Sequence, residues 1–233
     1  MLRIGIVAEG PTDQIVLEAI MDAHFAGGDQ EPFFRYIQPV RDERGKPGFG
    51  NWELVFDWLR QGRYREALQM TDIVVIHVDT DVCERKGFDV SRRQDGRDLS
   101  DVELVASVIA KLSGLIDAAF LLEHGHSLVF AIPVNEIECW LLPLLFDNKK
   151  AGKTMGCCEA ASHELRKRGQ RGLAGGDEKF PAAYETVAGG FRRRRDVDDA
   201  RSRSPSLDAF VKDLDGKCRP PTPPMSADSP VAE

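Results

Sequence analysis

The sequence predicts an α/β protein: a parallel sheet of about four strands with flanking helices, followed by a C-terminal helical extension. Short apolar runs typical of buried strands recur along the first half, at residues 2–8, 33–40, 72–78 and 127–134. Stretches with helical spacing of apolar residues separate these runs. Alternating strands and helices favour a parallel sheet with right-handed crossovers.

The helices are predicted from their start signals and apolar faces. Gly10-Pro11 ends the first strand, and Thr12 or Asp13 can cap the helix that follows. Ser100 or Asp101 begins a long helix, while the polar segment 82–100 before it reads as an active-site loop or lid. The predicted helices cover residues 12–26, 51–68, 101–116 and 136–146.

The character of the chain changes after about residue 147. We expect an α/β domain over residues 1–147 and a helical extension packed on it over 148–217. No further strand is expected in this extension. The proline-rich residues 218–233 are predicted to be disordered.

Composition indicates a protein with a real core and no membrane span. Of the 233 residues, 42% are hydrophobic and 30% are charged, and the longest apolar stretch is far too short to cross a bilayer. The start of the chain lacks the pattern of a signal peptide, so we expect a cytoplasmic protein. Its five scattered cysteines form no CxxC pair and predict neither a zinc ribbon nor a disulfide framework.

Acidic residues follow two of the predicted strands. Glu9 ends the first strand, and Asp79 and Asp81 come directly after the third. Carboxyl ends of neighbouring parallel strands meet at one sheet edge, and two acids two residues apart point to the same side of an extended segment. An isolated Asp-x-Asp is also common at a strand end or turn. Three converging carboxylates favour a bound cation, so the pattern predicts a Mg²⁺ or Mn²⁺ site acting on phosphates.

These acidic strand ends resemble the TOPRIM domain of topoisomerases, bacterial primases, OLD-family nucleases and small standalone relatives. Val7-Ala8-Glu9-Gly10-Pro11-Thr12-Asp13 and Asn135-Glu136-Ile137-Glu138-Cys139-Trp140-Leu141-Leu142 are similar to segments of the OLD and standalone forms. The resemblance covers roughly residues 1–147. It implies that Glu9, Asp79 and Asp81 are catalytic metal ligands, with Glu138 or Glu136 as a further ligand.

Other candidates surround these acids. Gly10 allows a tight turn, and the helix beginning near Thr12 would aim its N-terminus at an anion. Basic side chains that could grip a phosphate backbone are Arg85, Lys86, Arg92 and Arg93, although a solvated loop explains them equally well. Lys179 matches a lysine of the C-terminal region of relatives. His77, inside an apolar strand, reads as a core histidine.

The first functional hypothesis is a Mg²⁺- or Mn²⁺-dependent nuclease, with nucleic acid as its partner and an anti-phage or mobile-element setting implied by the resemblance. A second is a phosphatase resembling the haloacid-dehalogenase family, with Asp79 as nucleophile and Asp81 as acid/base. That reading leaves Glu9 without a role. A third is a noncatalytic metal-binding module that works with a partner ATPase.

Overall fold

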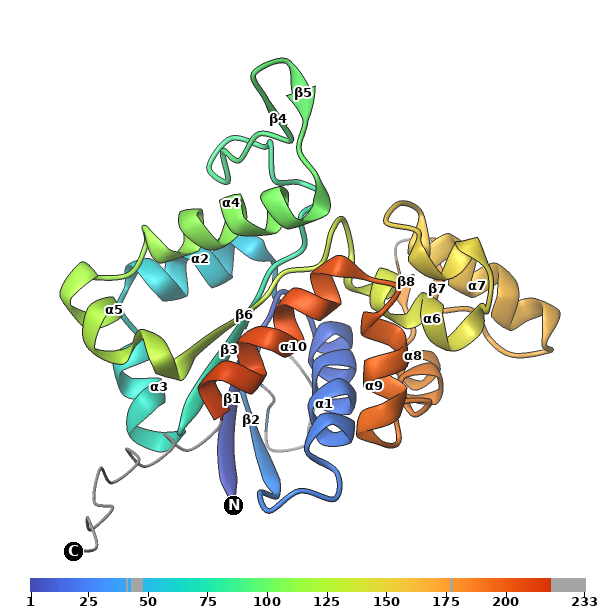
Figure 1. The fold of residues 1–233 in the computed structure, drawn as a ribbon, viewed down its shortest axis with the longest axis horizontal. Coiled ribbons are helices and arrows are strands. Elements are labelled where there is room, and N and C mark those ends of the chain that lie inside the picture. Colours follow the sequence, from blue (N-terminus) through green and yellow to red (C-terminus); the bar gives the residue numbers. More distant parts are fainter. Residues whose placement is uncertain (41, 43–47, 177, 219–233) are drawn as a thin grey trace, which may run out of the picture.

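The computed structural model describes residues 1–40, 42, 48–176 and 178–218, so the predicted tail lies outside it apart from Cys218. Its centre is a parallel sheet in the order β2-β1-β3-β6 (Figure 1). The strands are β1 (Leu2–Val7), β2 (Pro32–Gln38), β3 (Ile73–His77) and β6 (Leu128–Ala131). With the helices on either side, this sheet confirms the predicted fold class.

Helices cover both faces of the sheet because alternate strand residues point to opposite sides. One face packs against α1 (Pro11–Phe25) and the C-terminal helices, and the other against the helices between β2 and β6. The second group is α2 (Trp52–Arg60), α3 (Tyr64–Met70), α4 (Asp101–Ser113) and α5 (Ala118–His124). The C-terminal group is α7 (Cys157–Lys167), α8 (Pro181–Ala188), α9 (Arg194–Arg201) and α10 (Pro205–Cys218).

Two predicted helices are each interrupted. The helix expected over 51–68 breaks between α2 and α3, where Gly62 has a φ of +68°. The helix expected over 136–146 begins as the 3₁₀ helix η2 (Ile137–Leu141) and continues as α6 (Leu142–Leu145). Pro143 has no N–H to donate to Cys139, so the first turns cannot form a continuous α-helix.

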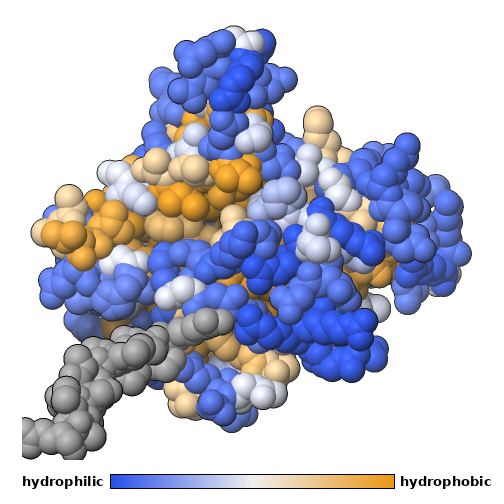
Figure 2. All heavy atoms as spheres, in the orientation of Figure 1, coloured by the Kyte–Doolittle hydropathy of each residue, from blue (hydrophilic) through white to orange (hydrophobic). Residues whose placement is uncertain are grey.

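Short elements also form where none was predicted. Two short antiparallel strands of two residues each, β7 (Ala174–Gly175) and β8 (Glu178–Lys179), pair in the C-terminal region. They correct the expectation of no strand after residue 147. The polar segment 82–100 contains a second hairpin, β4 (Arg93–Gln94) with β5 (Arg97–Asp98). Figure 2 shows hydrophilic residues over this hairpin, which projects from the body because it has no apolar face to bury. The remaining 3₁₀ turns are η1 (Gly125–Ser127) and η3 (Lys149–Gly152).

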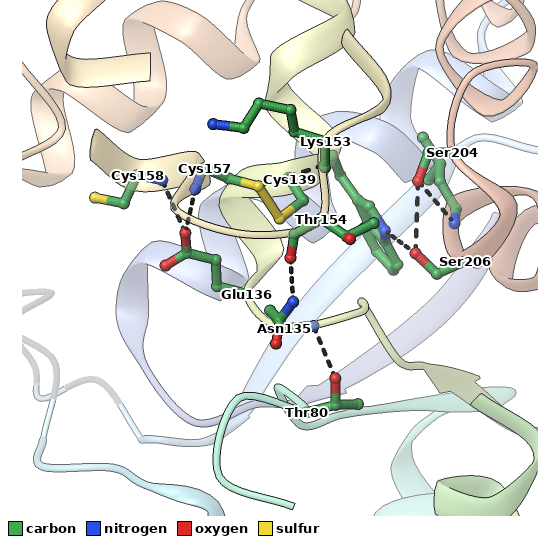
Figure 3. Close-up of a disulfide and its surroundings, with 12 residues drawn as sticks. Thr80, Asn135, Glu136, Cys139, Lys153, Thr154, Cys157, Cys158, Ser204 and Ser206 are labelled. Atoms are coloured by element: carbon green, nitrogen blue, oxygen red, sulfur yellow. Dashed lines mark hydrogen bonds between the residues drawn. A yellow bond between two sulfur atoms is a disulfide. The ribbon is translucent and has the colours of Figure 1, made fainter. Parts of the chain in front are cut away.

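A disulfide corrects the cysteine prediction. Cys139 in η2 is bonded to Cys157, the first residue of α7 (Figure 3). The two cysteines are 18 residues apart in the chain, and only the fold brings them together. The bond fastens the segment after β6 to the C-terminal helices.

No described helix alone has the length and apolar character needed to cross a bilayer. One bent pair, α4 with the segment Ala118–Ser127, meets those two criteria jointly.

The outer edge of β6 is covered by side chains of α10. The Phe130 N–H donates to Asp213 Oδ2 at 3.1 Å, and the Lys217 ammonium donates to the Leu128 carbonyl. Lys217 also bonds Asp213 at 2.9 Å. These contacts satisfy backbone groups that an edge strand otherwise leaves open to pairing with another chain.

We therefore expect Asp213→Ala to lower the free energy of unfolding by about 1–3 kcal/mol, because the Phe130 N–H loses its acceptor. Urea denaturation measures the change. Lys212→Ala is the control on the same helix, since Lys212 is exposed and pairs only with Asp208 among the described residues. Its effect should stay within about 0.5 kcal/mol. Equal losses in the two variants would contradict this role of Asp213.

Candidate metal centre

Glu9 and Asp79 meet at the carboxyl ends of β1 and β3. The register of these parallel strands, with Val7 opposite Ile76, brings the two residues side by side. The Asp79 N–H donates to Glu9 Oε1 at 2.7 Å. Asp79 is buried, and its Oδ1 has no hydrogen-bond partner among the described residues. The structure thus brings together two of the three acids on which the sequence prediction rested.

Asp13 and His77 complete this acidic cluster, although neither was predicted as a site residue. Asp13 accepts the Gly10 N–H at 2.7 Å, as a capping residue at the start of α1. His77 is fully buried, with Nε2 3.3 Å from Asp79 Oδ1 and Nδ1 3.8 Å from Asp13 Oδ2. Two features of the sequence could have indicated these residues. His77 lies two residues before Asp79, so both side chains are on one face of an extended segment. Asp13 lies three residues after Gly10, the spacing of a helix-capping residue.

Burial and mutual repulsion disfavour the charged carboxylates. Burial raises the pKa of Glu9, and the neighbouring Asp79 raises it further. Burial likewise raises the pKa of Asp79, against the opposing effect of His77. Burial alone would lower the pKa of His77, but Asp79, Asp13 and Glu9 together raise it to about 9. In the absence of a further cation, bound protons therefore offset the repulsion among these carboxylates.

Glu138 enters the cluster from η2 and pairs with the C-terminal region. Its side chain is fully buried, with Oε1 2.7 Å from Lys179 Nζ and also bonded by the Tyr184 hydroxyl. Its Oε2 has no hydrogen-bond partner among the described residues. Burial lowers the pKa of Lys179, but Glu138, Asp13 and Asp79 together outweigh burial and the net shift is upward. The Glu138 charge also raises the pKa of Asp79, so the two carboxylates feel each other.

Glu136, the other of the two predicted acids, is bonded outside this cluster. Its carboxylate accepts the N–H groups of Cys157 at 2.6 Å and Cys158 at 2.9 Å, at the first turn of α7 (Figure 3). This is a structural interaction with a helix N-terminus. Glu136, Cys139 and Cys157 have ligand atoms within 4.8 Å of one another, but the disulfide occupies both sulfurs.

Asp81 lies on the open side of the centre. It is exposed and shares a groove of about 570 Å³ with Glu9, Arg85 and Lys86. Neither of these two cations forms a side-chain hydrogen bond or ion pair with another described residue. Both are thus available to an anionic ligand beside the acids.

The other two predicted arginines do not line this groove. The Arg92 guanidinium donates to Asn135 Oδ1 at 2.6 Å and to the Thr80 carbonyl, while Asn135 donates its N–H to Thr80 Oγ1. Arg92 therefore fixes the Asp-x-Asp turn against the segment after β6. Arg93 lies in the projecting hairpin, where it forms an ion pair with Asp98.

Gly10 and Thr12, in the turn after β1, do not have the roles that the sequence predicted for them. A Cβ on Gly10 would make an ordinary contact with Asp13, so space does not require glycine there. Thr12 is buried and lies 3.4 Å from Asp13 Oδ1 rather than facing the groove. A Cβ on Gly50 would lie 2.1 Å from the Glu9 carbonyl oxygen, so Gly50 is the glycine that the site requires.

Comparison of this chain with family models, curated proteins and solved structures gives no match.

The pKa shifts predict how the metal-free protein responds to pH. Glu9, Asp79 and His77 bind protons more tightly in the folded chain than in the unfolded one, so stability falls as pH rises from about 5 to about 9. Thermal melting measures this, and Mn²⁺ should raise the melting temperature most at the high end because protons compete there least. Asp79→Asn should make the dependence shallower. A pH dependence unchanged in that variant would contradict the cluster.

Gly50→Ala should displace Glu9 while leaving every carboxylate side chain of the site in the sequence. The added methyl forces the Glu9 backbone or the Gly50 loop to move, and we expect about a 10–100-fold loss of Mn²⁺ affinity by calorimetry. Gly216→Ala is the matched control, because its Cβ would meet no described atom within 4 Å. Unaltered Mn²⁺ binding by Gly50→Ala would show that this contact does not position Glu9.

Proposed function

We propose that this chain is a TOPRIM-type nuclease that cleaves phosphodiester bonds with Mg²⁺ or Mn²⁺. The observation that carries the proposal is the convergence of Glu9, Asp13, Asp79 and Glu138 at one end of the sheet. Proteins rarely bury several carboxylates together without a cation or protons to offset their repulsion. The resemblance of the acidic strand ends to TOPRIM segments supports the same reading.

The donor set fits a divalent cation that prefers oxygen ligands. Glu138 Oε2 is a buried oxygen without a hydrogen-bond partner among the described residues, and Asp79 Oδ1, which also lacks a hydrogen bond there, has the His77 imidazole as an ion-pair partner at 3.3 Å. A buried carboxylate oxygen that lacks a hydrogen bond is costly unless a cation lies against it. Glu9, Asp79 and Asp81 would hold one ion, and Asp13 and Glu138 would serve a second.

The proposed reaction divides the work between ion and side chains. When bound, Mg²⁺ would polarise the phosphate and lower the pKa of its water. Arg85 and Lys86 bind the phosphate backbone in the groove, and Lys179 lies against Glu138 as a cation for the developing negative charge. Glu9, with a raised pKa, is suited to hold or release a proton when it is not a ligand.

The setting of this activity follows only from the resemblance. Standalone TOPRIM-like proteins occur beside restriction and anti-phage systems, and small members are often encoded near ATPases. An ATPase partner for this chain is accordingly part of the proposal.

The test compares substrates and variants in one assay. Plasmid, single-stranded DNA, tRNA and p-nitrophenyl phosphate are incubated with Mg²⁺ or Mn²⁺ and the wild-type, Glu9→Ala or Asp79→Ala protein. We expect cleavage of nucleic acid that falls about a hundredfold or more in both variants, because each removes a ligand. Glu123→Ala, which removes an exposed carboxylate on α5, should keep full activity.

Two other outcomes would replace the proposal. Hydrolysis of p-nitrophenyl phosphate that is lost in Asp79→Ala but kept in Glu9→Ala indicates the phosphatase. Metal binding by calorimetry without turnover of any substrate, even with an added ATPase partner, indicates the noncatalytic module.

A further inference from the structure

We propose that the groove beside Glu9 and Asp81 receives an unpaired nucleotide whose base stacks on Trp52, so that the substrate is single-stranded at the cleavage point. The inference deepens the proposed function and rests on it. It names the substrate class from the walls of the groove rather than from its carboxylates. One groove holds Trp52, the two acids, Arg85 and Lys86.

Trp52 is held as a rigid wall. Its ring lies 5.2 Å from Phe56 in an edge-to-face contact and 5.4 Å from Phe88 in a tilted one. Gly87, with a φ of +99°, lets the chain pass the ring closely, since a Cβ there would be 3.3 Å from the indole. The side chain is half-buried and is one of the residues that line the groove. A fixed aromatic face binds a base with little loss of side-chain entropy.

Stacking of a base on an aromatic side chain favours binding of single strands over duplexes. A base within a duplex has both faces covered by its neighbours, whereas an unpaired base offers a face to an aromatic side chain. The groove, of about 570 Å³, has the size of a small-ligand site. It therefore suits one or two nucleotides.

The charges of the lining make this binding depend on the metal ion. Three carboxylates, Glu9, Glu53 and Asp81, face two cations, Arg85 and Lys86. The lining thus carries no net positive charge unless a divalent cation is added. Phosphate binding needs that cation, because the two basic side chains alone do not overcome the acids.

Fluorescence anisotropy of labelled oligonucleotides tests the inference, with Ca²⁺ or EDTA in place of Mg²⁺. We expect oligo-dT or oligo-U to bind more tightly than a blunt duplex in Ca²⁺, and to bind weakly in EDTA. Trp52→Ala should weaken single-strand binding about tenfold, while Trp52→Phe keeps most of it. Comparing dT with U distinguishes a DNA from an RNA source of the nucleotide.

Two controls separate binding from folding. Lys86→Ala removes an exposed cation and should weaken binding and its salt dependence, whereas Lys150→Ala, outside the groove, should not. Equal affinity for duplex and single strand, or unchanged binding by folded Trp52→Ala, overturns the inference. Binding that depends on Trp52 without any cleavage in Mg²⁺ contradicts the nuclease activity alone. Cleavage that is unchanged in Trp52→Ala and equal for single-stranded and duplex substrates contradicts the stacking alone.

Discussion

Repulsion between carboxylates that the sheet brings to one edge is the constraint on which the candidate centre depends. Parallel pairing of β1 with β3 fixes Glu9 beside Asp79, and α1 adds Asp13 because it begins directly after β1. The fold offsets this charge with two cations: the buried His77 lies between Asp13 and Asp79, and Lys179, whose side chain is 40% exposed, lies against the buried Glu138. Removing either cation leaves a buried carboxylate without its partner and is destabilising. The stability of this end of the sheet and the proposed binding of a cation there therefore share one cause.

The C-terminal region contributes to the centre as well as covering the sheet. Lys179 and Tyr184, from β8 and α8, are the described partners of Glu138, and one apolar cluster joins β1, α1 and the C-terminal helices. The disulfide and the contact of Glu136 with α7 also join these two regions. A boundary at residue 147 describes the change in sequence character, but packing and the acidic site both cross it.

Sequence patterning predicted the parts of the site that depend on strand ends. The apolar runs of β1 and β3 end in acids, so Glu9 and Asp79 were predictable from local pattern and the geometry of parallel strands. The remaining parts depend on contacts between distant segments. The spacing of Glu136 and Glu138 did not reveal which of them lies near the other acids. Glu136 is bonded instead to the first turn of α7, which is distant in the sequence. The contact of Gly50 with Glu9 and the disulfide likewise arise only once the chain has folded.

In the proposed function, the electrostatic arrangement would couple metal, proton and substrate. The inner acids, Asp79 and Glu138, are buried and lie against the cations His77 and Lys179, while Asp81 lies in an open groove with Arg85 and Lys86. A divalent cation at the inner acids would displace the protons that offset their repulsion, and the same ion would supply the positive charge that the groove lacks. A phosphate would then meet an attractive rather than a neutral or repulsive surface. Because each of these steps would act through the same charges, an isosteric change at Asp79 would alter proton uptake and metal binding together, and it would alter phosphate binding through the metal.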